Sequence, residues 1–192
     1  VTAVAVHSPH MPGVVLDSTL LREYPHGEVL AHVLGYVGPV TEEDQAGDPD
    51  PLMRLPEFRI GKNGIEDAHD QLLRGRAGLR RVEVNAIGRE IRELDRDDGR
   101  AGDDVRLSLD LELQAFTYER LSAELSASSV VVDVNTGAVL ALASVPSFDP
   151  TAFLGRLSHQ QWKEWRDSPR TPLVNKCIRG QYPPGSTFKM IV

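Results

Sequence analysis

Apolar residues along this chain gather in short runs separated by polar turns, which indicates a mixture of short strands and helices. The clearest pattern is a hairpin: residues 130–134 and 138–143 are almost continuously apolar, and Asn135-Thr136-Gly137 lies between them. Runs of this kind indicate strands that are buried on both faces. A second hairpin is predicted around an Asn85–Gly88 turn, and weak alternation over residues 1–16 predicts further short strands.

Three stretches carry the signals of a helix. Thr41 can cap a short helix, and the stretch from Gly61 to Glu66 opens another that Gly75 ends. Asp110 can cap a third helix. Its apolar face is predicted to consist of residues at helical steps of three and four, namely Leu111, Ala115, Tyr118, Leu121 and Leu125.

Polar segments divide the chain. Residues 47–56 contain three prolines and two aspartates and are expected to form an exposed loop. Residues 95–104 form a polar, glycine-containing connector that is the candidate domain boundary, and residues 105–109 are predicted to form a strand directly after it. We recognise no internal repeats in the sequence. The chain is therefore expected to consist of two unequal parts.

Composition restricts the functional classes. The 192 residues can hold one domain or two small ones, and 41% hydrophobic with 26% charged residues is ordinary for a globular protein. The net charge is −7 and the arginines are dispersed, which argues against a nucleic-acid partner. Cys177 is the only cysteine, so an intrachain disulfide is excluded. His7, His10 and His26 match no ligand spacing, so we expect them on the surface and expect no metal site.

The two ends of the chain suggest a piece of a longer protein. No apolar run approaches the ~18 residues of a membrane helix, and no signal peptide opens the sequence. The sequence does not begin with methionine, and it stops at Val192, a few residues into a predicted helix. We therefore expect an internal fragment.

The candidate chemistry lies in the stretch from Gly180 to Lys189. Pro183-Pro184-Gly185 ends whatever precedes it, so a helix can begin at Ser186. Lys189 then lies on the same face as Ser186, because residues three apart on a helix are neighbours. A serine hydroxyl is a weak nucleophile unless a base takes its proton, and a lysine with a depressed pKa can be that base. Ser186 is the candidate nucleophile and Lys189 the candidate base.

By itself, a Ser-x-x-Lys pair is a weak signal. With 12 serines and 4 lysines, chance alone gives roughly 0.25 such pairs in this chain. The ten-residue context is much more specific, because it resembles the active-site segment of the penicillin-binding proteins, which are serine D,D-transpeptidases.

Further segments resemble the class B penicillin-binding proteins, and in particular their elongation-specific type, in the same order along the chain. The resemblance covers essentially the whole sequence and draws its specificity from this collinearity. One departure is Thr151, where asparagine is expected after Pro150, and it puts a local turn contact in question. The matching motifs are Tyr24-Pro25-x-Gly27, Gly35-Tyr36-Val37-Gly38, Ile60-Gly61-Lys62-x-Gly64-Ile65-Glu66, Arg74-Gly75-x-x-Gly78, Val82-Glu83-Val84-Asn85, Gly88-Arg89, Leu109-Asp110-x-x-Leu113-Gln114, Asn135-Thr136-Gly137-Ala138-Val139-Leu140-Ala141, Pro146-Ser147-Phe148-Asp149-Pro150, Pro172-Leu173-x-Asn175 and Tyr182-Pro183-Pro184-Gly185-Ser186-Thr187-x-Lys189.

The resemblance implies an α+β fold. Residues 1–103 would form part of an elongated mixed-strand module, the non-catalytic dimerisation or pedestal module of these proteins. Residues 104–192 would form the N-terminal part of a serine transpeptidase domain of the β-lactamase-like type. The whole protein would be held by an N-terminal helix at the extracytoplasmic, periplasmic side of the bacterial cell membrane.

The resemblance also implies the reaction. Ser186 would attack peptidoglycan stem peptides that end in D-Ala-D-Ala, Lys189 would accept its proton, and β-lactams would acylate the same serine. No metal or organic cofactor is implied. A membrane glycosyltransferase of the elongation machinery is the implied protein partner. The Ser-x-Asn and Lys-Thr/Ser-Gly motifs of the family cannot be placed in this chain, so the fragment is expected to be inactive alone.

Three other functions stay open at this point. A serine β-lactamase also suits Ser186-Thr187-Phe188-Lys189, although the roughly 100 residues before the predicted strand at 105 argue against it. A non-enzymatic β-lactam sensor would use the same segment. A non-catalytic scaffold would use residues 1–103 to dock a membrane glycosyltransferase of the elongation machinery.

Overall fold

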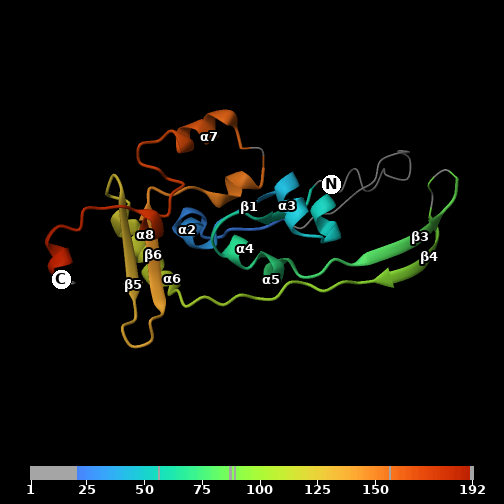
Figure 1. Cartoon of the computed structure of the whole chain (residues 1–192), viewed down its shortest axis with the longest axis horizontal. Coiled ribbons are helices and arrows are strands. Elements are labelled where there is room, and N and C mark those ends of the chain that lie inside the picture. The colour runs from blue at the N-terminus through green and yellow to red at the C-terminus, as the bar shows by residue number, and fades with distance from the viewer. Residues whose placement is uncertain (1–20, 56, 87, 89, 156, 191–192) are drawn as a thin grey trace.

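The computed structural model describes residues 21–190, apart from residues 56, 87, 89 and 156. The strands expected within residues 1–16, together with His7 and His10, lie outside the described residues. The molecule is elongated, as Figure 1 shows. The hairpin of β3 (Leu79–Val84) and β4 (Glu90–Asp97) lies at one end, and the hairpin of β5 (Ala127–Val132) and β6 (Val139–Val145) lies toward the other.

The elements are short helices and strands, and the paired strands of the described chain are antiparallel, which confirms the α+β class. Short 3₁₀ helices are labelled η. In chain order the elements are η2 (Gly27–Val29), α2 (Ala31–Leu34), β1 (Val37–Pro39), α3 (Glu42–Gly47), η3 (Pro51–Arg54), β2 (Arg59–Gly61), α4 (Gly64–Ala68), α5 (Asp70–Arg74), β3, β4, α6 (Leu111–Leu121), β5, β6, η4 (Pro150–Phe153), α7 (His159–Arg166), α8 (Lys176–Arg179) and η5 (Gly185–Met190).

The strands of the described chain form three separate two-stranded antiparallel sheets: β1 with β2, β3 with β4, and β5 with β6. Both predicted hairpins are therefore confirmed. The predicted burial of the β5–β6 hairpin on both faces is wrong for β5. Ala141 and Ala143 of β6 are fully buried, whereas Val130 and Val132 of β5 are nearly half exposed. The reason is that α6 and α2 pack mainly against β6.

The N-terminal helices follow the local signals in part. Thr41 caps α3 through a complete capping box with Asp44, as predicted. The helical stretch after Gly61 is two short helices, α4 and α5, which meet at His69. Residues 47–56 are not simply an exposed loop, because they contain η3, in which Met53 is buried.

Helix α6 begins as predicted but faces in another direction. The Asp110 carboxylate accepts a hydrogen bond from Leu113 N–H at 3.0 Å and caps the helix. The predicted apolar face is wrong, since Leu111 is exposed and the fully buried residue is Gln114. The strand predicted over residues 105–109 is also absent. This segment is joined to β6 by isolated hydrogen bonds, from Ser108 Oγ to Val139 O and from Asp110 N to Leu140 O.

One aromatic cluster joins early and late parts of the chain. Phe148 is only 1% exposed, and its ring centroid lies 5.3 Å from that of His32 and 6.0 Å from those of Tyr36 and Trp165. The ring of Phe153 stacks on Tyr36 at 3.7 Å. These contacts hold α2 and β1 against the segment that follows β6, and Trp165 belongs to the same cluster.

Two identical tetrapeptides, Gly75–Gly78 and Gly99–Gly102, pair at the base of the β3–β4 hairpin. Arg76 and Arg100 exchange both backbone hydrogen bonds, at 2.8 and 2.9 Å. Gly75 and Gly99 have φ of +70° and +69°, and a Cβ on either would lie 2.3 or 2.5 Å from the facing backbone. The tetrapeptide is thus an internal repeat that the sequence analysis missed. We call this pair the glycine neck.

Candidate active site

The two predicted site residues, Ser186 and Lys189, both lie in η5. The helix begins at Gly185, one residue earlier than predicted, and it is a 3₁₀ helix rather than an α-helix. In a 3₁₀ helix the side chains of residues three apart are eclipsed, so Ser186 and Lys189 lie on the same side, one turn apart. Gly185 has a φ of +54°, which lets the chain turn into η5 after Pro183-Pro184.

Ser186 and Lys189 are both exposed. Their side chains have no hydrogen bond or ion pair to another residue in the described part of the chain. A serine becomes a nucleophile when a desolvated base lies beside it. The described residues therefore place the candidate nucleophile and the candidate base on one face, but they do not build the enclosed environment in which the pair would react.

The segment before η5 is held firmly on the β5–β6 sheet. Ser144 Oγ accepts a hydrogen bond from Lys176 N–H at 3.1 Å, and Cys177 Sγ donates to Ala143 O at 3.1 Å. Burial raises the pKa of the Cys177 thiol. A half-buried, protonated thiol bonded to a backbone carbonyl serves packing rather than catalysis.

A buried histidine that the sequence analysis overlooked lies beside this segment. His32 is 7% exposed, and neither of its ring nitrogens has a hydrogen-bond partner of good geometry among the described residues. Burial, reinforced by the nearby Lys176 ammonium, lowers the pKa of His32 to about 4, although the carbonyls of Pro146 and Pro172 oppose the shift. The available signal was a lone histidine inside the apolar run from Glu28 to Val37.

A second buried cluster explains the motif around Gly61. The Glu66 carboxylate accepts hydrogen bonds from Arg22 Nη2 at 2.9 Å and from Tyr24 Oη at 3.4 Å, and its Oε1 forms an ion pair with Arg22 Nε at 2.8 Å. Tyr24 Oη in turn accepts Val37 N–H at 3.1 Å. Burial, followed by the charge of Glu66, raises the pKa of Tyr24 to about 12. This cluster ties β1 to α4 and is structural.

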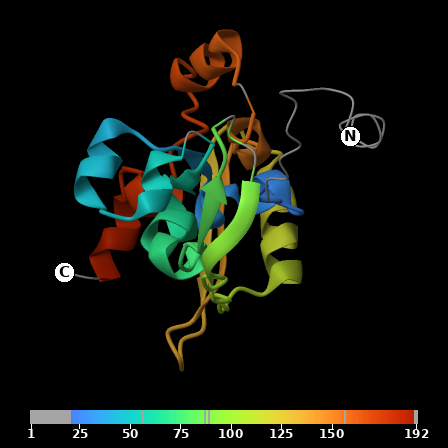
Figure 2. The ribbon, with the colours of Figure 1, turned by 90° about the vertical axis from the view of Figure 1, so that its right-hand side faces the viewer.

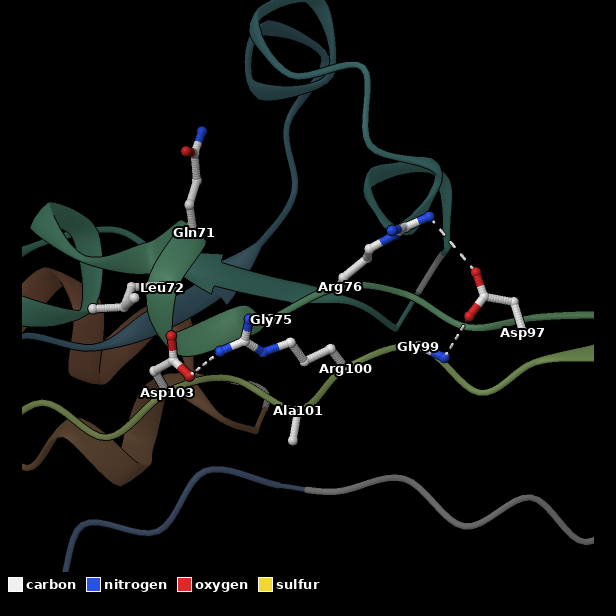
Figure 3. A pocket seen from close by; sticks show the side chains of 9 residues that line it. All are labelled: Gln71, Leu72, Gly75, Arg76, Asp97, Gly99, Arg100, Ala101 and Asp103. Carbon is white, nitrogen blue, oxygen red and sulfur yellow. Dashed lines mark hydrogen bonds and ion pairs between the residues drawn. The ribbon is translucent and has the colours of Figure 1, made fainter.

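A pocket of about 380 Å³ lies between α5 and the glycine neck (Figure 3). Its charged side chains are paired with each other: Arg76 with Asp97 at 3.6 Å, and Arg100 with Asp103 at 2.9 Å. All four are at least half exposed. Ser186 belongs to η5, which lies at the end of the chain marked C in Figure 1, away from α5, so this pocket is not part of the candidate active site.

Neither a metal site nor a membrane span is found in the described chain. Over residues 21–190, no group of three or more His, Cys, Asp or Glu side chains could hold a metal ion. His26 is exposed, as predicted. Within the same residues, no helix has both the length and the apolar character needed to cross a bilayer.

Comparison with known families places two domains on the chain. The family described as Penicillin-binding Protein dimerisation domain matches residues 1–107, and Penicillin binding protein transpeptidase domain matches residues 127–192. A curated relative, peptidoglycan D,D-transpeptidase MrdA of Escherichia coli K12, is 40% identical over 195 aligned residues. The alignment covers 100% of this chain and 31% of the relative, so the chain spans about a third of that protein.

Solved structures show the same fold. Penicillin-binding protein 2 (PBP2) of Helicobacter pylori, in complex with MreC, matches with a TM-score of 0.75 and 32% identity, over 88% of this chain and 31% of that one. PBP2 of Pseudomonas aeruginosa, in complex with WCK 5153, matches with a TM-score of 0.69 and 34% identity, over 91% of this chain and 34% of that one.

Proposed function

This chain belongs to the class B penicillin-binding proteins, and on that premise we propose that the protein carrying it is a peptidoglycan D,D-transpeptidase of the elongation-specific type. The observation that carries the proposal is the Ser186–Lys189 pair. Its two side chains are eclipsed one turn apart in η5, directly behind Pro183-Pro184-Gly185, within the region that the transpeptidase family matches.

The reaction begins with an attack of Ser186 Oγ on the penultimate D-Ala carbonyl of a stem peptide. Lys189 takes the hydroxyl proton as the new C–O bond forms. Backbone N–H groups, one of them that of Ser186, stabilise the oxyanion, and such stabilisation commonly accounts for much of the rate enhancement in acyl transfer. The terminal D-Ala leaves with a proton, and an ester on Ser186 remains. An amine from a neighbouring strand then displaces Ser186 and completes the cross-link.

β-Lactams acylate the same serine, because their strained amide takes the place of the D-Ala-D-Ala peptide bond. The chemistry uses only side-chain and backbone groups, and no cofactor is part of the proposal. A serine β-lactamase and a β-lactam sensor share this acylation step. A β-lactamase differs because it hydrolyses its acyl-enzyme rapidly, and a sensor differs because it releases no D-Ala from a D-Ala-D-Ala peptide.

We place the division between the non-catalytic module and the transpeptidase domain at residues 103 and 104. The support is local: residues 98–104 are mostly exposed, and no helix or strand of the described chain lies between β4 and α6. Residues 1–103 then serve as the pedestal, and residues 104–192 begin the catalytic domain.

The partners are inferred from the same premise. The H. pylori relative was solved with MreC, which supports an elongation-machinery partner for this protein as well. We further assign it a membrane glycosyltransferase partner and a location at the extracytoplasmic side of the cell membrane, where its peptidoglycan substrate lies.

The deciding experiment uses the full-length protein with Ser186→Ala and, as a control, Ser126→Ala at an exposed position. Each is incubated with benzylpenicillin and analysed by intact mass. We expect a persistent one-to-one adduct on wild type and on Ser126→Ala, and none on Ser186→Ala. Wild type and Ser126→Ala should also release D-Ala from a D-Ala-D-Ala peptide, and Ser186→Ala should not. An adduct on Ser186→Ala, or rapid turnover of penicillin by wild type, would contradict the proposal.

A further inference from the structure

The side chain of Asn175 connects two parts of the molecule that are far apart in sequence. Its Oδ1 accepts a hydrogen bond from Cys177 N–H at 3.1 Å and so caps α8. Its Nδ2 donates to His32 O at 3.0 Å, 143 residues away in α2. Only one orientation of the amide satisfies both contacts, because the reverse would set donor against donor and acceptor against acceptor. One side chain therefore fixes α8 relative to α2.

The hydrogen bond from Asn175 to His32 O joins two elements, α8 and α2, that are each held in place by other contacts. His32 O lies in the short helix α2, where the last carbonyls lack helical partners and need another donor. Ala31 beside it is fully buried, and the His32 ring packs edge-on against Phe148. On the other side, Ser144 Oγ accepts Lys176 N–H and fixes α8 on β6. Asn175 is thus held between a helix of the N-terminal module and the sheet of the catalytic part.

Helix α8 is the last firmly held element before the nucleophile. Gly180 N–H closes it with a hydrogen bond to Lys176 O at 3.0 Å. The side chains of Ser186 and Lys189 form no hydrogen bond or ion pair with the rest of the described chain, so they add no anchor of their own. The direction in which the chain leaves α8 therefore sets the start of the segment that leads to Ser186.

We infer that Asn175 is a positioning residue, which sets the orientation of the Ser186 segment by locking α8 onto α2 of the N-terminal module. This inference rests on the proposed function. Displacing a nucleophile by about 1 Å can lower the rate of the chemical step by ~10²-fold. Loss of the Asn175–His32 hydrogen bond, which is one of several contacts that hold α8, should slow acylation by less, about tenfold.

The test uses two variants of the full-length protein. Asn175→Asp keeps an oxygen that can cap α8 but replaces the donor to His32 O with a second acceptor. Asn175→Ser also keeps a favourable cap, carries no charge, and is too short to reach His32 O. The matched control is Asn63→Asp, because Asn63 caps α4 through its Oδ1 in the same way and lies away from η5.

Stopped-flow acylation by a fluorescent penicillin separates non-covalent binding from the acylation rate constant. We expect both Asn175 variants to acylate about tenfold more slowly, with the dissociation constant and the active fraction within twofold of wild type. Asn63→Asp should match wild type. A merely structural role would lower only the active fraction, so that result would overturn the inference, as would unchanged acylation in Asn175→Ser. Failure of wild type to acylate at Ser186 would instead overturn the proposed function, and this inference with it.

Discussion

The side-chain amide of Gln114 forms the two hydrogen bonds to the Leu142 backbone that a neighbouring β-strand would form. Its Oε1 accepts Leu142 N–H at 2.7 Å, and its Nε2 donates to Leu142 O at 2.9 Å. The same Nε2 also donates to Val29 O at 2.8 Å, so one amide joins α6, β6 and the last residue of η2. A fully buried glutamine is stable here because every polar atom of its side chain has a partner.

This relationship predicts a large loss of stability for Gln114→Leu. Leucine is of similar size, but it leaves the buried backbone groups of Leu142 and Val29 unpaired, which costs ~1–3 kcal/mol for each group. We expect the free energy of unfolding to fall by about 3 kcal/mol, measured by urea unfolding of the full-length protein. Gln160→Leu on the exposed face of α7 is the control and should change it by less than ~0.5 kcal/mol.

The lowered pKa of His32 predicts that the protein loses stability in acid. This pKa is about 4 in the folded protein and 6.5 for an ordinary histidine, so between these values the unfolded chain binds the extra proton. Stability should therefore fall as the pH drops from 6.5 to 4, by about 3 kcal/mol in total. His32→Phe should remove this part of the pH dependence, whereas His26→Gln at an exposed position should retain it. Parallel pH profiles for wild type and His32→Phe would contradict this prediction.

Lys189→Arg should nearly abolish acylation of the full-length protein by penicillin. A guanidinium stays protonated in proteins and cannot accept the Ser186 proton. Lys163→Arg in α7 makes the same change at an exposed position and should acylate normally. The measurement is the rate of labelling by a fluorescent penicillin. Labelling of Lys189→Arg at the wild-type rate would reduce Lys189 to an electrostatic or structural partner.

The chain of 192 residues, expressed alone, should not react appreciably with penicillin. Ser186 and Lys189 are present, yet both are exposed in the described structure, and a lysine acts as a base only when burial or neighbouring charges favour its neutral form. Loss of a single oxyanion donor alone costs roughly 2.7–4 kcal/mol in other acyl-transfer enzymes. Intact-mass analysis after incubation with benzylpenicillin is the measurement. A stoichiometric adduct on Ser186 would show that these 192 residues carry a competent site.

The features that could be predicted from the sequence depend on neighbouring residues. Thr41 and Asp44 form a cap because they are three residues apart, and the β5–β6 hairpin turns at Asn135-Thr136-Gly137. The proposed pairing of Ser186 with Lys189 rests on the same kind of short spacing. The type of helix in η5 could not be predicted, since a single turn is decided by its surroundings.

The features that could not be predicted depend on distant partners. Gln114 reaches residues 28 and 85 positions away, and these contacts, rather than the apolar period, decide which face of α6 is buried. Residues 105–109 have the pattern of a strand, but in this stretch only the Ser108 side chain bonds to β6, at Val139 O, so no backbone ladder forms. Asn175 donates a hydrogen bond to His32 O, 143 positions away in the sequence, so no local sequence pattern could predict this contact.

The glycine neck makes the β3–β4 hairpin a self-contained unit. The chain leaves and re-enters the body at one point, where the two Gly-Arg-Ala-Gly tetrapeptides pair, and β3 and β4 pack chiefly on each other (Figures 1 and 2). We therefore expect that the segment between Gly78 and Gly99 can be lengthened, shortened or replaced while Arg76 and Arg100 stay paired at its base. Among related sequences, length variation should concentrate between these two glycines, and the same interval is the natural place to splice in a foreign hairpin.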